Sequence, residues 1–137
     1  MTTHPRLLQT ALDATDVRAL AEFYGQLLGL EYRAGDAPPS DGSADDADWL
    51  VLVYPDGSRA LAFQLVDHLV PTTWPDPDVP MQLHLDMTVP DRRSLETVRH
   101  RVHDLGGRLL LDRTDDEEEP LYVFADLAGH PFCVFVA

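Results

Sequence analysis

The chain of 137 residues contains one pattern of elements twice, and this repeat limits the folds that it can adopt. In the first half, Asp16 precedes apolar residues at helical spacing, and Gly29 follows them where a left-handed residue ends many helices. In the second half, Asp91 precedes a similar pattern that ends at Gly106 and Gly107. Asp16 and Asp91 are 75 positions apart. The sequence therefore predicts two helices, capped by Asp16 and Asp91, that hold equivalent places in two related modules.

Strand-like segments surround both predicted helices in the same order. A short strand precedes each helix, and three segments rich in Val, Leu, Phe and Tyr follow it. Both halves therefore read β-α-β-β-β, which predicts an α+β fold of two tandem βαβββ modules. The expected core contains apolar side chains from both helices and from the strands: Leu12, Leu20, Phe23, Leu27, Phe63, Leu83, Leu85, Leu95, Val98, Val102 and Phe132.

The expected organisation is a single domain over residues 1–137. Module one covers about residues 6–66, a proline-rich connector covers 67–80, and module two covers about 81–137. Residues 35–48 are rich in Pro, Gly, Ser and Asp, so we expect this loop to be mobile. The acidic run at 114–120 is expected to be a solvated loop.

Composition excludes several classes of function. The formal net charge of −14 would repel a phosphate backbone, so nucleic acid is not an expected partner. Cys133 is the only cysteine, which excludes a disulfide within the chain. No apolar stretch approaches the roughly 20 residues that cross a bilayer. We therefore expect a cytoplasmic protein with no membrane partner.

Residues 81–86, with the sequence MQLHLD, place a histidine on the polar side of a predicted strand. Alternation would turn Leu83, Leu85 and Met87 toward the core, with the polar residues Gln82, His84 and Asp86 on the other face. The 75-residue offset makes Gln9 the counterpart of His84. Alignment of Phe63 with Phe132 in the last strands makes Gln64 the counterpart of Cys133.

Three segments, 9–32, 83–91 and 126–136, together resemble the glyoxalase, bleomycin-resistance and extradiol-dioxygenase superfamily, also called the vicinal-oxygen-chelate superfamily. Within this superfamily, the sequence is most similar to the glyoxalase-like domain group. This resemblance implies paired βαβββ modules whose curled mixed sheets surround a cleft, and a homodimer. It also implies that metal ligands, where a member has them, come from the first and last strands of each module. Here those places hold Gln9, Gln64, His84 and Cys133.

These four side chains are a poor set for the metals of such sites. Hard divalent ions prefer carboxylates and imidazoles, whereas this set has two neutral amides, one imidazole and one thiol. The family usually has Glu on the last strands, so Gln64 and Cys133, which stand at those places here, depart from its pattern. We therefore expect no metal cofactor, although a divalent ion on Gln9, Gln64, His84 and Cys133 stays open. Asp13 and Asp86 lie on the same strand faces as Gln9 and His84 and could replace a ligand, but they stand four and two residues farther along their strands.

Two functions follow from the resemblance. The first is a binding protein with a degenerate metal site, which sequesters a small organic molecule, with cationic ligands included, or performs metal-free chemistry. Its ligand would contact the polar positions Gln9, Gln64, Gln82, His84, Asp86 and Cys133. The alternative is a metal-dependent lyase, isomerase or dioxygenase acting on a small organic substrate. His84 is the best candidate for a general base, whereas Cys133 could be a nucleophile only with a lowered pKa. The sequence leaves open whether the protein is an enzyme.

Overall fold

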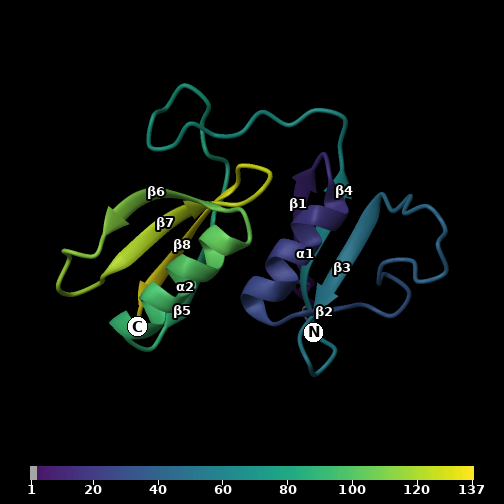
Figure 1. Ribbon diagram of the computed structural model, residues 1–137, viewed down its shortest axis with the longest axis horizontal. Coiled ribbons are helices and arrows are strands. Elements are labelled where there is room, and N and C mark those ends of the chain that lie inside the picture. Colours follow the sequence, from purple (N-terminus) through teal and green to yellow (C-terminus); the bar gives the residue numbers. More distant parts are fainter. Residues whose placement is uncertain (1–2) are drawn as a thin grey trace. The chain divides into compact units, whose positions relative to one another are not determined.

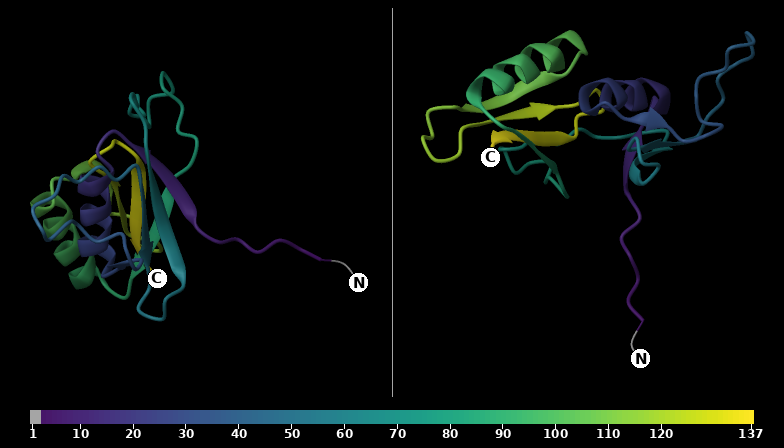
Figure 2. Two further views of the ribbon diagram at one scale, coloured as in Figure 1. Left: turned by 90° about the vertical axis from the view of Figure 1, so that its right-hand side faces the viewer. Right: turned by 90° about the horizontal axis from the view of Figure 1, so that it is seen from below.

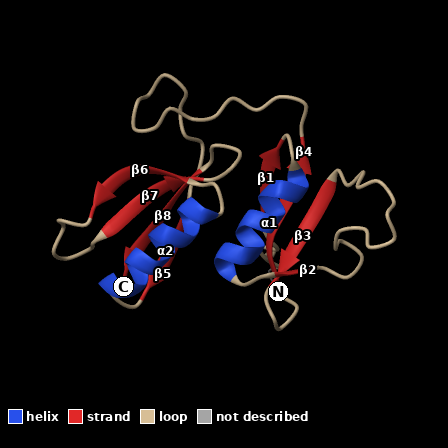
Figure 3. Cartoon of the chain, in the orientation of Figure 1, coloured by secondary structure: helices blue, strands red, loops and turns tan. Residues whose placement is uncertain are grey.

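A computed structural model describes residues 3–137 of the chain. The chain divides into two compact units, Met1–Asp67 and His68–Ala137. Each unit has one helix and one four-stranded mixed sheet, which confirms the predicted βαβββ repeat (Figures 1 and 3). That both units form a single domain stays a prediction. No helix within residues 3–137 has the length and apolar character needed to span a membrane.

In the first unit, the sheet order is β1-β4-β3-β2, with β1 parallel to β4 and the other neighbours antiparallel. Helix α1 begins after Asp16, whose side chain accepts a hydrogen bond 3.0 Å long from the Ala19 amide, and ends at Gly29 in the left-handed region. Phe63 of β4 is fully buried, and its ring stacks on that of Tyr24 in the helix. The elements are β1 (Thr10–Ala14), α1 (Val17–Leu28), β2 (Glu31–Tyr32), β3 (Trp49–Val53) and β4 (Arg59–Leu65).

The second unit repeats this plan with the sheet order β5-β8-β7-β6 and a parallel β5–β8 pair. The Asp91 side chain accepts a hydrogen bond from the Ser94 amide and so caps its helix, as predicted. In each unit the helix covers one face of the sheet (Figure 2). The elements are β5 (Leu85–Val89), α2 (Arg92–Asp104), β6 (Arg108–Arg113), β7 (Leu121–Ala125) and β8 (Pro131–Val136).

Aromatic residues define which face of the second sheet is covered by α2. The rings of Tyr122, Phe124 and Phe132 form a buried cluster. The ring centroid of Phe124 lies 5.7 Å from that of Tyr122 and 5.4 Å from that of Phe132. Arg99 of α2 lies over the Tyr122 ring, which places this cluster on the helix side. Because side chains alternate along a strand, Cys133 points to the opposite face, which we call the far face.

Most of the predicted core is buried, with three exceptions. Leu83 is 49% exposed, so its assignment to the core was wrong. The reason is that β5 begins only at Leu85, and Leu83 therefore precedes the ladder that would have turned it toward α2. Leu85 and Val98 are half-buried rather than buried. The remaining predictions are confirmed, since these side chains are buried: Leu12, Leu20, Phe23, Leu27, Phe63, Leu95, Val102 and Phe132.

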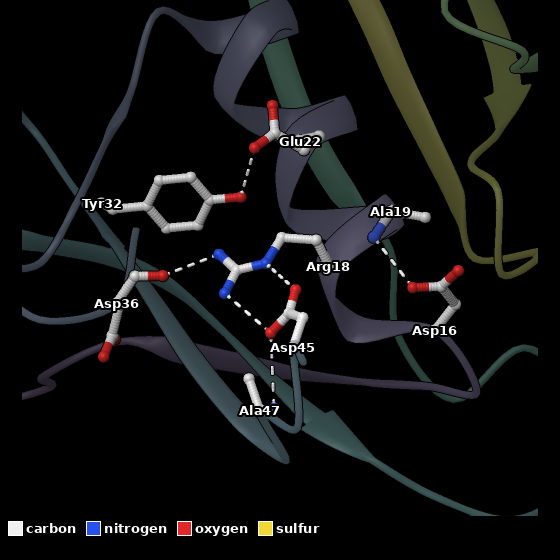
Figure 4. A network of polar contacts seen from close by, with 8 residues as sticks. All are labelled: Asp16, Arg18, Ala19, Glu22, Tyr32, Asp36, Asp45 and Ala47. Atoms are coloured by element: carbon white, nitrogen blue, oxygen red, sulfur yellow. Dashed lines mark hydrogen bonds and ion pairs between the residues drawn. The ribbon is translucent and has the colours of Figure 1, made fainter. Parts of the chain in front are cut away.

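Arg18 anchors the acidic loop between β2 and β3 (Figure 4). Its guanidinium donates two hydrogen bonds to the Asp45 carboxylate, at 2.6 and 3.1 Å, and one to the Asp36 carbonyl at 2.7 Å. It also lies over the ring of Tyr32, whose hydroxyl donates to Glu22. The loop expected to be mobile therefore has two fixed points, and mobility stays a prediction for the residues between them.

Candidate functional site

The pairing of β5 with β8 brings three polar side chains together on the far face. Asp86 and Cys133 are Cα partners in this parallel pair, so their side chains point to the same face of the sheet. His84 directly precedes β5 and lies two residues before Asp86, which turns its side chain to that face as well. The strand register therefore places an imidazole, a carboxylate and a thiol side by side.

The distances among these groups are short. His84 Nε2 lies 3.1 Å from Asp86 Oδ1, and one atom each from His84, Asp86 and Cys133 lie within 4.8 Å of one another. We call these three residues the donor cluster. The side chains of His84 and Asp86 are 37% and 56% exposed, while Cys133 is half-buried. A molecule arriving from solvent would therefore meet the imidazole and the carboxylate first.

The electrostatics of the cluster keep the Cys133 thiol protonated. Burial raises the pKa of Cys133 to about 11, and the negative charge of Asp86 and a hydrogen bond to it act in the same direction. A nucleophilic cysteine needs a lowered pKa, because the thiolate is the reactive species. Cys133 without a bound cation is therefore a hydrogen-bonding group and a poor nucleophile at neutral pH.

The corresponding place in the first unit carries no such cluster. Thr10 pairs with Leu61 in the first unit as Leu85 pairs with Phe132 in the second. The next pair along each ladder is Ala11 with Ala62 and Asp86 with Cys133, so Ala11 and Ala62 are the counterparts of Asp86 and Cys133. The predicted match of Gln64 with Cys133 was therefore wrong, and Gln64 instead corresponds to Phe135. The error came from aligning Phe63 with Phe132, two similar residues that stand two positions apart in the register.

The structure also shows where the three glutamines of the predicted site lie. Gln9 directly precedes β1 and is the counterpart of His84, and its buried Oε1 has no hydrogen-bond partner within the described chain. Gln64 is exposed near the other end of β4, paired with Asp13. The strand rise puts Gln9 and Gln64 about 13 Å apart along the β1–β4 pair. Gln82 is exposed and precedes β5. The donor cluster therefore contains His84, Asp86 and Cys133 but none of these glutamines.

Sequence reasoning underestimated Asp86. It identified the residue as facing the same way as His84, but treated it as a carboxylate that could replace a ligand from a place two residues farther along the same strand. The parallel pairing shows instead that Asp86 is directly beside Cys133. The repeat could not have shown this, because the two halves differ in length before their last strands: Ala11 and Asp86 are 75 positions apart, whereas their strand partners Ala62 and Cys133 are 71 apart.

The donor cluster is a poor match for a hard divalent ion. Mn²⁺ and Mg²⁺ favour oxygen and imidazole ligands in octahedral geometry, and a thiol is a soft ligand that selects other metals. Of the three groups, one carboxylate and one imidazole suit such an ion and Cys133 does not. The residues present therefore do not fit a site for a hard ion.

Comparisons with known proteins agree with this fold. A family model described as "Glyoxalase-like domain" matches residues 9–135, so the chain belongs to this family and to the vicinal-oxygen-chelate superfamily. No curated protein matches the sequence.

Solved structures with the same fold have low sequence identity to this chain. The fosfomycin resistance protein FosX from Listeria monocytogenes is 14% identical with a TM-score of 0.69, covering 98% of this chain and 95% of its own. A mutant of the same protein, complexed with Mn(II) and 1S,2S-dihydroxypropylphosphonic acid, is 15% identical with a TM-score of 0.70, covering 98% and 94%. A glyoxalase/bleomycin resistance protein/dioxygenase family enzyme from Burkholderia phytofirmans is 12% identical with a TM-score of 0.67, covering 94% and 96%. At these identities the likeness establishes the fold.

The raised pKa of Cys133 predicts an unreactive thiol. With a pKa of about 11, roughly one molecule in 10,000 carries the thiolate at pH 7, so modification by Ellman's reagent should be slow and should accelerate up to about pH 11. Asp86→Asn removes the negative charge and should speed modification at pH 8. The protein unfolded in denaturant is the control for full reactivity. A folded protein that reacts at pH 7 as fast as the unfolded one would contradict the assignment.

Proposed function

We propose that the protein binds a small organic molecule on the far face of the second unit's sheet, with His84 as the main polar contact. The observation that carries this proposal is the donor cluster: His84 is held 3.1 Å from Asp86 and remains partly exposed. Among residues 3–137 the structure gives no partner to the other ring nitrogen, Nδ1, which can accept or donate a hydrogen bond according to its protonation. His84 can thus serve as a positioned contact for a ligand.

The charge of the site indicates what kind of ligand it favours. Asp86 is a partly exposed carboxylate, and the chain has a formal net charge of −14. Neither feature favours an anionic ligand, because a negative field repels it. A ligand with an amine or another hydrogen-bond donor would instead find acceptors at Asp86. We therefore infer a neutral or cationic ligand.

Metal-dependent lyase, isomerase or dioxygenase activity is the alternative. Those reactions use the ion as a Lewis acid or to activate oxygen. One solved structure with this fold holds Mn(II), but the donor cluster here contains a thiol and only one carboxylate. The chemistry of these side chains therefore favours binding, or metal-free chemistry with His84 as the base, over catalysis with a hard ion.

Two further aspects of the proposal concern assembly and location. Each sheet ends in strands with one unpaired side, β1 and β2 in the first unit and β5 and β6 in the second. Unpaired strand edges are usually covered or paired in native proteins. We infer that the protein forms a homodimer in which such an edge is covered, and that it acts in the cytoplasm.

A thermal-shift screen with a matched pair of histidine variants tests the binding function. The screen covers neutral metabolites, thiol conjugates and cationic antibiotics in the presence of EDTA. A hit should raise the melting temperature of the wild type and of His100→Ala, whose histidine is exposed on α2, but not of His84→Ala. Adding Mn²⁺ or Mg²⁺ should not increase the shift. A ligand that stabilises the protein only with Mn²⁺ would reverse the preference for binding over metal-dependent catalysis.

Light scattering coupled to gel filtration tests the assembly. We expect a mass of twice the 15.3 kDa of one chain at micromolar concentration, because an unpaired strand edge is then covered. A monomer at that concentration would refute the homodimer.

A further inference from the structure

His84 lies outside the sheet that fixes the other two members of the donor cluster. The ladder of β5 with β8 begins at Leu85, so it holds Asp86 and Cys133 but does not include His84. The imidazole is 37% exposed and is tied to the sheet through Asp86, at 3.1 Å. The path of the backbone that leads into β5 must therefore determine where His84 stands.

That path contains a loop, residues 72–79, which two threonines close at its neck. Thr72 Oγ1 donates a hydrogen bond to the Val79 carbonyl at 2.8 Å and accepts one from the Trp74 amide at 3.1 Å. Thr73 Oγ1 accepts from the Val79 amide at 3.0 Å and donates to the Asp76 carbonyl at 2.9 Å. Hydroxyl side chains hold backbone turns in this way. The two ends of the loop are therefore bound to each other, and we call residues 71–80 the strap.

The first end of the strap packs on the turn between β7 and β8. A Cβ at Gly129 would lie 2.5 Å from Pro71 Cβ and 3.2 Å from its Cα, so Pro71 leaves no room for a side chain there. Asp126, which is 5% exposed, braces this turn by accepting hydrogen bonds from the Ala128 and His130 amides at 2.8 and 3.0 Å. The contact of Gly129 with Pro71 therefore clamps the strap onto a braced turn.

The clamp lies at the same end of the sheet as His84. By extension of the β5–β8 register, His84 stands level with Pro131, two residues after Gly129. Pro80, the other end of the strap, precedes His84 by four residues, which an extended chain covers in at most about 14 Å. In the view from below, the teal hook of residues 72–79 lies on the side of β8 away from α2 (Figure 2). Both ends of the strap are thus held near His84, and its loop lies on the far-face side.

We propose that the strap positions His84, and that displacing Pro71 from Gly129 releases the imidazole from Asp86. Asp86 and Cys133 stay in place because the ladder holds them, so the clamp controls one member of the donor cluster. Its importance for a ligand rests on the proposed binding function. Gly129 is then a positioning residue that acts through Pro71. A ligand that contacts His84 and the closed clamp stabilise each other, since such coupling is reciprocal.

Gly129→Ala and Gly57→Ala form a matched pair that separates the clamp from backbone strain. Both glycines have a positive φ, 92° and 87°, but a Cβ at Gly57 meets nothing within 4 Å. In Gly129→Ala, the Trp74 and Val79 amides should exchange their hydrogens at least about 10-fold faster, because the strap opens more often. In Gly57→Ala their exchange should equal that of the wild type. Unchanged exchange in folded Gly129→Ala would overturn the clamp.

Nuclear magnetic resonance of the His84 ring tests the positioning, which a purely structural turn would not affect. The ring signal is assigned with His84→Ala. In Gly129→Ala it should move toward its position in Asp86→Asn, because both changes remove the contact with the Asp86 carboxylate. In Gly57→Ala it should stay as in the wild type. A folded Gly129→Ala protein with faster exchange in the strap but an unchanged His84 signal would refute the positioning role.

Pro71→Gly tests the same clamp from the other side, without strain in the turn between β7 and β8. It removes the Cβ and Cγ atoms that lie against Gly129 and should produce the same two changes. It replaces Gly129→Ala if far-UV circular dichroism shows that variant to be misfolded. A wild-type His84 signal in folded Pro71→Gly would contradict the proposal. These measurements need no ligand, so the strap and the proposed binding function can fail separately.

Discussion

The register of the parallel β5–β8 pair is the constraint on which the site depends. It sets Asp86 beside Cys133, and the two-residue alternation of an extended chain then adds His84 on the same face. Phe132, the partner of Leu85 in this pair, helps to fix the register, because its ring must lie under α2 with Tyr122 and Phe124 of β7 to be buried. A slip by one residue would turn either the aromatic rings or the polar groups to the wrong face. Core packing on one face of the sheet therefore determines the chemistry on the other.

The two units show how one scaffold can carry a site in only one of its copies. Their helices, N-terminal caps and sheet orders correspond, and in each unit an Arg of the helix lies over a Tyr ring, Tyr32 of β2 and Tyr122 of β7. At the positions of Asp86 and Cys133, however, the first unit has Ala11 and Ala62. Alanine side chains have no donor atoms, so Gln9 is left with a buried oxygen that has no partner within the described chain. The repeat is thus preserved in packing and lost in polar function.

Much of the fold could be predicted from the sequence because the signals were local. Asp16, Gly29 and Asp91 mark helix ends through short-range hydrogen bonds and backbone conformation, which a sequence displays directly. The composition of the site could be predicted only in part. The pairing of Asp86 with Cys133 joins residues 47 positions apart, and it depends on which residue of β8 lies opposite β5. Similarity of Phe63 to Phe132 was also a poor guide to the correspondence between the last strands of the two units. The exposure of Leu83 followed from where β5 begins.

The most direct measurement is the register itself, obtained from cross-strand nuclear Overhauser effects in the isotope-labelled protein. The account predicts backbone contacts that join Leu85 with Phe132, Asp86 with Cys133 and Met87 with Val134. These contacts need no ligand or metal, so they test the origin of the donor cluster before any function is assumed. Contacts displaced by one residue, with Asp86 opposite Phe132 or Val134, would put Cys133 on the other face of the sheet and contradict the account.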